Sequence, residues 1–443
     1  MTIESRYLWY IRGAAALTIF LILFTVTYFK FSEHKHLESN SSKTIVKLNG
    51  PWKFKTGDHP QWALPGIDDS QWEAVDFTAP AGARDGDVGI SGYIPGWMKH
   101  GHSHYSGYAW YRIKIPLDHI KADNLSLLAP SAVDDAYQVY VNGILQGNSG
   151  DFSKKDPTAY GIQPKMFLLP LKGEKDITIA FRVWMSSATL EQGTDLGGIH
   201  VAPELGSQND ISKKYKFQWG QLIKGYIVEI VEPVMFLLLA LIIYFVNQSK
   251  SKINSGKGFI PALVLIALLR LNQAVYSWFQ IESAHQYDII TSVILRPLVL
   301  GAWLLAWWEW YSLHRPQWFP KVIAVLTIVY ITVQLMGLEW ISRYINHLLF
   351  QDISQYIRYL FLILMLYIVI SGFVNEKQKN WLALLAALLI AVGLFPQEVS
   401  LLHITGIWFP YGVGVSRTQY FYAAFVLVMY MMLLQKQKRI IYG

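Results

Sequence analysis

The sequence contains no cysteine among its 443 residues. Disulfide bridges, thiolate catalysis, cysteine zinc sites and iron–sulfur clusters are therefore excluded. Charge is also scarce, since Asp, Glu, Lys and Arg make up 16% of the chain, against about 25% in an ordinary soluble protein. Apolar residues, in contrast, make up 53%. This balance indicates a membrane protein, and any domain outside the membrane must be held together by its apolar core alone.

A long apolar run near the N-terminus, Gly13–Phe29, follows Arg6 and Arg12. A cleaved signal peptide needs a small-residue site after its apolar core, and this run ends in Thr-Tyr-Phe-Lys-Phe instead. The pattern predicts that residues 1–35 form a cytoplasmic N-terminus and an uncleaved anchor helix. A cleaved signal peptide is the alternative.

Residues 216–443 contain repeated apolar runs of roughly 20 residues, which is long enough to cross about 30 Å of hydrocarbon. They predict a transmembrane domain of seven helices, and eight helices in all with the anchor. The predicted helices cover residues 221–246, 258–280, 288–312, 321–340, 350–374, 381–402 and 417–435. Within the third, the aromatic run Trp303–Leu313 predicts an interfacial belt at the cytoplasmic face.

Lys and Arg concentrate in alternate loops, as the positive-inside rule requires. The loops placed inside carry Lys250, Lys252, Lys257, Arg315, Lys321, Lys377 and Lys379, and the tail carries Lys436, Lys438 and Arg439. Membrane topology therefore accounts for the net charge of +7, and no nucleic-acid partner is needed. We predict a multi-pass protein of the bacterial inner membrane, embedded in lipid, with both termini cytoplasmic and residues 36–215 periplasmic or extracellular.

The region 36–215 has a different sequence pattern, in which short alternating apolar runs are separated by turn residues. Examples are Tyr108–Ile115, Ala136–Gly143 and Asp176–Trp184. Such runs indicate an all-β sandwich or barrel, and Asn142-Gly143 between two of them is a strong hairpin signal.

Four short motifs in this region resemble, in order, those of the N-terminal sugar-binding jelly-roll domain of glycoside hydrolase family 2. They lie at Trp52–Phe54, Asp68–Trp72, Gly107–Arg112 and Val139–Gly143. The resemblance implies a galactose-binding-like jelly roll. Enzymes of that family carry their catalytic carboxylates on a (β/α)₈ barrel further along the chain. The membrane helices leave no room for a barrel here, so we expect no glycosidase activity.

The layout of the whole chain, an anchor, a β ectodomain and seven helices, resembles the bacterial seven-transmembrane receptors with diverse intracellular signalling modules. That resemblance implies a sensor whose ectodomain binds a ligand, often presumed to be carbohydrate, and whose helices relay the signal. Only nine residues follow Leu434, so we expect a separate cytoplasmic signalling protein to carry the output.

The stretch Met98–Arg112, "MKHGHSHYSGYAWYR", places His100, His102 and His104 at alternate positions. A metal site, and with it a metal-dependent hydrolase, is one interpretation because imidazole is a common metal ligand. Gly101 and Ser103 separate the histidines, which favours a polar loop at the rim of the sandwich. We predict neither a metal nor another cofactor, and we name four candidate ligand contacts in this loop: Trp97, His102, His104 and Tyr105.

Ionisable residues inside membrane helices are costly and are candidates for function. Six of them are placed between the middle of the membrane and its outer leaflet: Glu229, Glu232, Arg270, Arg296, Arg358 and Glu398. They predict either a set of structural ion pairs or a polar pocket open to the outside. Two functions therefore remain open besides the hydrolase: a receptor-like sensor without turnover, and a membrane-embedded enzyme or transporter that uses this pocket.

Overall fold

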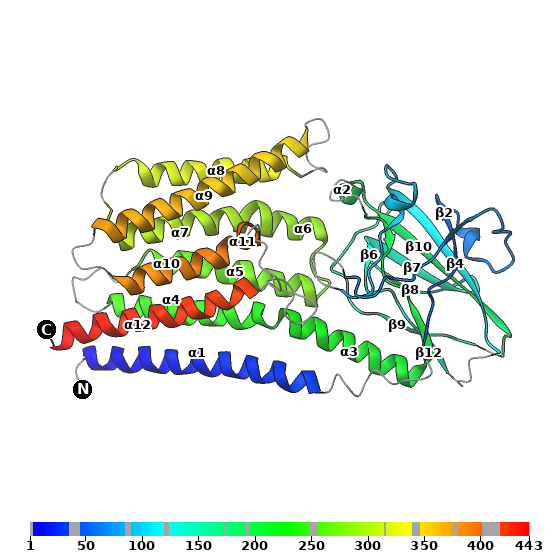
Figure 1. Ribbon diagram of the computed structural model, residues 1–443, viewed down its shortest axis with the longest axis horizontal. Helices are drawn as coiled ribbons and strands as arrows, with labels where there is room; N and C mark the ends of the chain where they lie inside the picture. Colours follow the sequence, from blue (N-terminus) through cyan, green and yellow to red (C-terminus); the bar gives the residue numbers. More distant parts are fainter. Residues whose placement is uncertain are drawn as a thin grey trace.

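The computed structural model describes residues 3–34, 45–84, 90–118, 124–171, 173–190, 195–248, 256–313, 316–338, 346–375, 380–400 and 417–442. It has two parts, which lie end to end along the long axis of the molecule (Figure 1). One part is built from β-strands and follows α1 in the chain. The other is a bundle of nearly parallel helices that α1 joins from the N-terminal side.

The strands of the β part form two main antiparallel sheets and one small one. The strands are β1 (Val46–Lys47), β2 (Trp52–Thr56), β3 (Glu73–Val75), β4 (Gly107–Pro116), β5 (Leu125–Leu128), β6 (Val133–Asp134), β7 (Ala136–Val141), β8 (Ile144–Ser149), β9 (Met166–Leu168), β10 (Asp176–Met185), β11 (Gly198–Ile199) and β12 (Glu204–Ser207). The six-stranded sheet has the order β3-β2-β4-β10-β7-β8, the four-stranded sheet β1-β12-β5-β9, and the two-stranded sheet β11-β6. Three short helices complete this part: η2 (Pro60–Ala63), η3 (Trp97–His100) and α2 (Ser187–Leu190).

The two main sheets share one apolar core, to which β2, β4, β7 and β10 contribute from one sheet and β5 and β12 from the other. Strand alternation works as predicted on β4: Tyr111 points into this core, whereas Trp110 packs on the other face against Trp72 and Ala180. The predicted hairpin is confirmed, because Asn142 (φ 49°) and Gly143 (φ 84°) form the turn between β7 and β8. Both positive φ values are those of the turn that Asn-Gly favours. The jelly-roll topology itself stays a prediction.

The helical part contains long helices that run along the same axis (Figure 1) and shorter helical pieces between them. They are α1 (Ile3–His34), α3 (Gln208–Tyr226), α4 (Val228–Gln248), α5 (Phe259–Trp278), α6 (Ala284–Asp288), the π-helical η4 (Ile289–Leu295), α7 (Arg296–Trp310), α8 (Phe319–Met336), α9 (His347–Asn375), α10 (Trp381–Leu394), α11 (Pro396–Ser400), η5 (Arg417–Gln419) and α12 (Tyr420–Tyr442). The start of α1 and the end of α12 lie at the same end of the bundle, far from the β part (Figure 1).

Six helical segments in the described part of the chain are long and apolar enough to cross a membrane: Arg6–Thr25, Gln208–Gln248, Phe259–Trp278, Ala284–Trp310, Phe319–Met336 and His347–Asn375. The prediction of eight spans is therefore confirmed only in part. The helix expected over 381–402 is broken, since α10 ends at Leu394 and Pro396 begins α11; proline disfavours a helical conformation in the residue before it. The last helix, α12, does form, but basic residues in its final turns reduce its apolar character.

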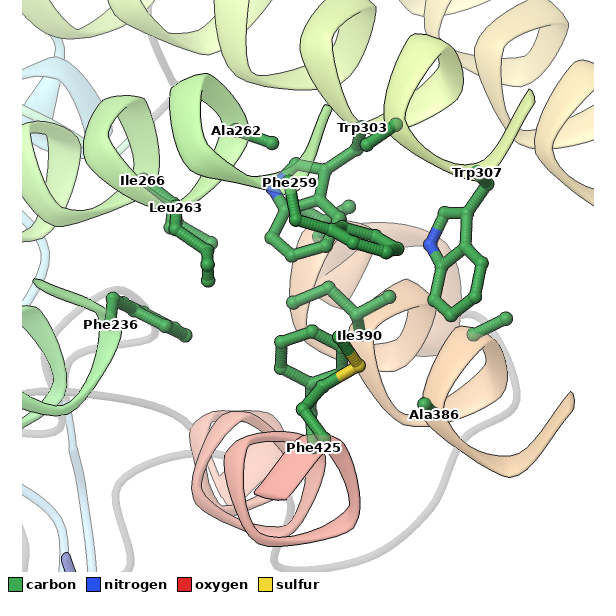
Figure 2. Packing of buried hydrophobic residues seen from close by; sticks show 14 of the residues in the cluster. Phe236, Phe259, Ala262, Leu263, Ile266, Trp303, Trp307, Ala386, Ile390 and Phe425 are labelled. Carbon is green, nitrogen blue, oxygen red and sulfur yellow. The ribbon is translucent and has the colours of Figure 1, made fainter. Parts of the chain in front are cut away.

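An aromatic cluster fills the centre of the bundle (Figure 2). Phe259 meets Trp307 edge to face at 4.9 Å between ring centroids, and Trp303 meets Phe425 in the same way at 5.2 Å. Trp303 and Trp307 have no exposed surface. The prediction that they belong to an interfacial belt is therefore wrong. Their rings fill the space between helices because small residues such as Ala262 and Ala386 lie opposite them (Figure 2).

One helical segment joins the two parts directly. Strand β12 ends at Ser207, whose hydroxyl accepts a hydrogen bond from the Asp210 amide (3.2 Å) and caps α3. From there α3 and α4 form a 41-residue segment, Gln208–Gln248. The helix was predicted to begin at residue 221, because the first turns are polar and carry no apolar run. Ile211 in this polar half is fully buried, and α3 contacts β5, β9 and β12 of the β part.

Candidate functional site

A cleft of about 580 Å³ lies where the β part meets the ends of the helices. Asp135, Trp184 and Thr189 belong to its β wall, and Asp288 and His347 belong to its helical wall. Its volume falls within the range of roughly 300–1,000 Å³ that is usual for small-molecule sites. Side chains and backbone of both parts therefore face one solvent-accessible space.

Asp135 anchors the β wall of this cleft. Its carboxylate accepts hydrogen bonds from the Ser186 amide (2.7 Å) and the Thr189 hydroxyl (2.8 Å). Its own amide donates to the carbonyl of Trp184 on β10 (2.7 Å). Burial, together with the neighbouring charge of Asp134, raises the pKa of Asp135 to about 6, although these hydrogen bonds oppose the rise. Asp135 is thus a cleft residue that changes charge close to neutral pH.

Asp134 holds a buried histidine behind the same wall. Nε2 of His200 lies 2.8 Å from the Asp134 carboxylate, and Nδ1 lies 2.9 Å from the carbonyl oxygen of Ile94. Tyr93 stacks on the imidazole at 4.7 Å between ring centroids. Burial alone would lower the pKa of His200, but the hydrogen bond and the charge of Asp134 outweigh it and raise that pKa. The Asp134–His200 pair therefore favours the charged imidazole.

The two walls also touch directly. The Ala284 amide, in the first turn of α6, donates to the carbonyl of Ala159 in the β part (3.0 Å). A Cβ at Gly161 would lie 2.5 Å from the carbonyl oxygen of Tyr276 on α5, closer than Cβ atoms approach other groups. The segment around 159–161 therefore rests on the ends of α5 and α6, and a side chain at position 161 would push the two parts apart.

Below the cleft, buried charges cluster in the bundle. Arg270 on α5 forms an ion pair with Glu229 and approaches Glu232 (Nε to Oε2, 3.3 Å), both of which lie on α4. The side-chain amide of Gln419 donates to Glu229 (3.1 Å), and the Tyr422 ring lies 5.9 Å from the guanidinium of Arg270. The structure thus brings three of the six predicted bundle residues into one cluster.

The other three lie together on different helices. Arg358 on α9 donates two hydrogen bonds of 2.8 Å to the carboxylate of Glu398 on α11. Arg296, the first residue of α7, lies within electrostatic reach of both. These contacts fit the interpretation as structural ion pairs. A pocket open to the outside stays a prediction.

The candidates in the histidine loop hold the β part together. Trp97 is 2% exposed, and its indole donates to the carbonyl of Tyr105 (3.1 Å). The Tyr105 hydroxyl accepts from the Gly57 amide (2.9 Å) and donates to the Tyr108 carbonyl. Ligand binding by this loop stays a prediction. The loop lies close to the cleft in the chain, because Ser106 and Gly107, which directly follow Tyr105, line the cleft.

The histidines of this loop diverge. His102 pairs with Glu73 (3.0 Å) and packs edge-on against Phe54, whereas His100 ends η3 and His104 is exposed in the following turn. Within the described residues, no group of three or more His, Cys, Asp or Glu side chains is arranged to hold a metal ion.

Sequence reasoning missed Asp134, Asp135 and His200. The only available signal is the Asp134-Asp135 pair directly before the apolar strand β7. His200 lies 66 residues further along the chain than its partner, so no local pattern joins them.

No protein-family model matches this chain, and no curated protein matches it. Solved structures similar to part of it include Bacteroides uniformis β-glucuronidase (21% identity, 36% of this chain and 17% of that chain, TM-score 0.27). Others are a glycosyl hydrolase family 2 member from Bacteroides cellulosilyticus (17% identity, 37% and 20%, TM-score 0.25) and Bifidobacterium dentium β-glucuronidase complexed with coumarin-3-O-glucuronide (15% identity, 38% and 30%, TM-score 0.27). The chain thus spans less than a third of these enzymes, and likeness of this extent carries no information about activity.

Proposed function

We propose that this protein is a membrane sensor. Its β part binds a carbohydrate or another small ligand in the cleft, and its helices relay the binding event to a separate signalling protein. The observation that carries this proposal is the continuous path from β12 through α3 into α4, which bears Glu229 and Glu232. A change in the position of the sheet therefore acts on the buried ion pairs without an intervening hinge loop.

The outer surface of the bundle supports the proposed placement in a membrane. Large apolar side chains such as Val325, Ile328, Ile363 and Ile370 are about 60% exposed, as they would be against lipid tails. With the positive-inside arrangement of the loops, the β part lies on the periplasmic or extracellular side and the termini lie in the cytoplasm. The cytoplasmic ends of the helices are then the surface for the signalling partner.

The cleft suits a sensor because its two walls belong to different parts of the molecule. A ligand that contacts both walls stabilises one relative arrangement of them, and a ligand shifts an equilibrium only as far as its affinities for the two arrangements differ. Binding between Trp184 on the β wall and His347 on the helical wall meets this requirement, whereas binding on the outer face of the sandwich does not.

The test uses the full chain in lipid nanodiscs and a set of oligosaccharides as probes, with binding measured by calorimetry and thermal shift. Ser187, at the start of α2, is exposed and lines the cleft. Ser187→Trp should abolish binding while the melting temperature without ligand stays unchanged. Ser153→Trp, at an exposed position on the β part that does not line the cleft, is the matched control and should bind normally.

Two results would contradict the proposal. Binding that survives Ser187→Trp would remove the cleft as the ligand site. Chemical turnover of a probe, or its flux across the nanodisc lipid in a vesicle assay, would favour the membrane-embedded enzyme or transporter over the sensor.

A further inference from the structure

Two carboxylates share a single guanidinium inside the bundle. Glu229 is fully buried and Glu232 is 4% exposed, and both face Arg270 from α4. Their spacing of three residues places them on the same face of the helix. Two negative charges against one positive charge leave the cluster with one uncompensated negative charge.

Hydrogen bonding shows the same deficit. Oε2 of Glu229, Oε2 of Glu232 and Oε1 of Gln419 are buried, and none of them has a hydrogen-bond partner among the described residues. A buried acceptor without a donor costs roughly 1–3 kcal/mol. Arg270 Nε, 3.3 Å from Glu232 Oε2, is a buried donor that also has no hydrogen-bond partner in the described part of the chain. These three acceptors therefore outnumber the free donor, and the cluster also has too little positive charge.

Among the described contacts, Arg270 is the cation that forms ion pairs with these carboxylates. Arg296 acts on the Tyr287 ring together with Glu229 and Arg270, but no described ion pair joins it to either carboxylate. Facing groups are Arg270 from α5, Tyr422 from α12, Gln419 from η5 and Tyr287 from α6. On α3, Lys224 is buried five residues before Glu229, and Arg270 is the cation that acts on the two carboxylates. On α1, which packs on α4, the ionisable side chains that the structure describes lie near its N-terminus, at the end of the bundle far from the β part: Arg6, Tyr7, Tyr10 and Arg12.

We infer that the Glu229–Glu232 pair binds one proton. A proton removes the uncompensated charge, which is costly in a water-poor interior, and it donates a hydrogen bond to one of the orphaned oxygens. A hard metal ion fits less well. Ions such as Ca²⁺ and Mg²⁺ need about six or more oxygen ligands, and here the positive guanidinium already lies against both carboxylates.

The second charged cluster provides an internal comparison. Glu398 and Arg358 pair one to one through two hydrogen bonds of 2.8 Å. Both carboxylate oxygens of Glu398 are thus satisfied, and no negative charge is left over. This pair needs no proton, even though it lies in the same bundle.

The proton site does not depend on the proposed ligand site. It lies on α4, however, the helix through which we propose that the binding event is relayed. Glu229 lies in the first turn of α4, which packs against α5, and Arg270 on α5 is the only described guanidinium that pairs with it. Separation of α4 from α5 would change the environment of both carboxylates. Movement of α4 is therefore linked to uptake or release of the proton.

Infrared spectroscopy of the full chain in nanodiscs tests this inference, at about pH 8, where ordinary carboxyl groups and Asp135 are ionised. The wild-type protein should show a carboxylic-acid C=O band. Glu229→Gln or Glu232→Gln should remove it, while Glu398→Gln should leave it in place. Gln has the shape of a protonated Glu, so both variants should fold, which circular dichroism and size-exclusion chromatography verify.

The wild-type spectrum alone can overturn the inference, because absence of the band at this pH excludes a bound proton. A band that persists in both Glu→Gln variants places the proton elsewhere. Replacement of Na⁺ by choline distinguishes a bound sodium ion from a bound proton. If Na⁺ raises the melting temperature and Glu229→Gln abolishes that rise, the cluster holds a metal ion instead of a proton.

Discussion

The β part and the helical bundle distribute apolar and charged side chains in opposite ways. The β part buries large aromatic residues such as Trp52, Trp97 and Trp110 in its interior. The bundle exposes large apolar residues such as Ile328 on its outer surface and buries charged ones, Glu229 and Arg358 among them. The β part thus keeps large apolar side chains inside, whereas the bundle presents them on its outer surface, as the proposed placement in a membrane requires.

The difference shows what holds each part together. Removal of apolar surface from water stabilises the β part. In the membrane that we propose for the bundle, this driving force between helices is absent, so close packing and polar contacts must select the arrangement. The glycines show this, since a Cβ at Gly372 or Gly393 would lie 2.2 Å from the ring of Tyr311 or Tyr422, respectively. Small residues and ion pairs thus have the role in the bundle that the aromatic core has in the β part.

The largest expected effect is on the aromatic core. Trp52 is fully buried, and its indole donates to the carbonyl of Leu48 (2.6 Å). Trp52→Ala should lower the free energy of unfolding of the β part by about 4 kcal/mol, because it leaves a cavity and an unpaired carbonyl. Urea denaturation in nanodiscs measures the change. Ile328→Ala on the outer surface of the bundle should cost far less, and equal costs would contradict the comparison.

Loss of a buried charge should come next. Arg358→Met leaves the Glu398 carboxylate without its partner in the bundle, which should cost roughly 3 kcal/mol. The double variant Arg358→Met/Glu398→Met should recover most of the loss, since it removes both charges. Thermal unfolding of the three proteins in the same lipid gives the comparison. A double variant that is no more stable than the single one would show that the pair has a role beyond charge compensation.

A moderate effect of pH is expected in the β part. The native pKa of Asp135, about 6, lies above its unfolded value, so its contribution to stability is present at low pH and is lost as the pH rises through about 6. The raised pKa of His200 acts in the same direction, with stability present below about 6.5 and lost above its native pKa. The melting temperature of the β part should therefore fall between about pH 5 and pH 8.

Asp135→Asn should remove the pH dependence of the melting temperature in the lower half of this interval. His200→Asn should remove it in the upper half. Calorimetric scans at several pH values measure both. A wild-type melting temperature that rises over this interval would contradict the sign of both shifts.

The smallest effect is expected at the edge of the β part. His102 and Glu73 form a partly exposed ion pair, with side-chain exposures of 22% and 53%. Glu73→Gln should change the free energy of unfolding by less than about 1 kcal/mol. The same chemical-denaturation assay detects it, and a loss as large as that of Arg358→Met would mean that surface and buried pairs are equivalent here.

Local patterns predicted the local features well. The alternating run at β4, the Asn142-Gly143 turn and the N-terminal helix follow from spacing and residue type alone. The polar helix α3 was missed because its stability comes from contact with β5, β9 and β12, which the sequence does not display. Contacts made by distant parts of the chain decided its conformation.

The candidate site was predictable only as a set of residues. Low charge made Glu229, Arg270, Arg358 and Glu398 conspicuous in apolar runs, yet the pairing of residues 40 or 41 positions apart depends on how the helices pack. The cleft was not predictable at all, because its walls come from both parts of the chain. Sequence alone was also insufficient for Trp303 and Trp307, because the same aromatic run occurs in interfacial belts and in buried cores.

The helical segment Gln208–Gln248 also fixes an angular relationship between the two parts. A helix turns by about 100° per residue and rises about 1.5 Å. The direction in which the helix starts after Ser207 therefore determines the side of the helix on which Glu229 faces Arg270. One residue inserted between them would rotate the carboxylate away from the guanidinium, whereas seven inserted residues, about two turns, would bring it back into phase. The orientation of the β part relative to the bundle is therefore determined by the register of this helix as well as by direct contacts.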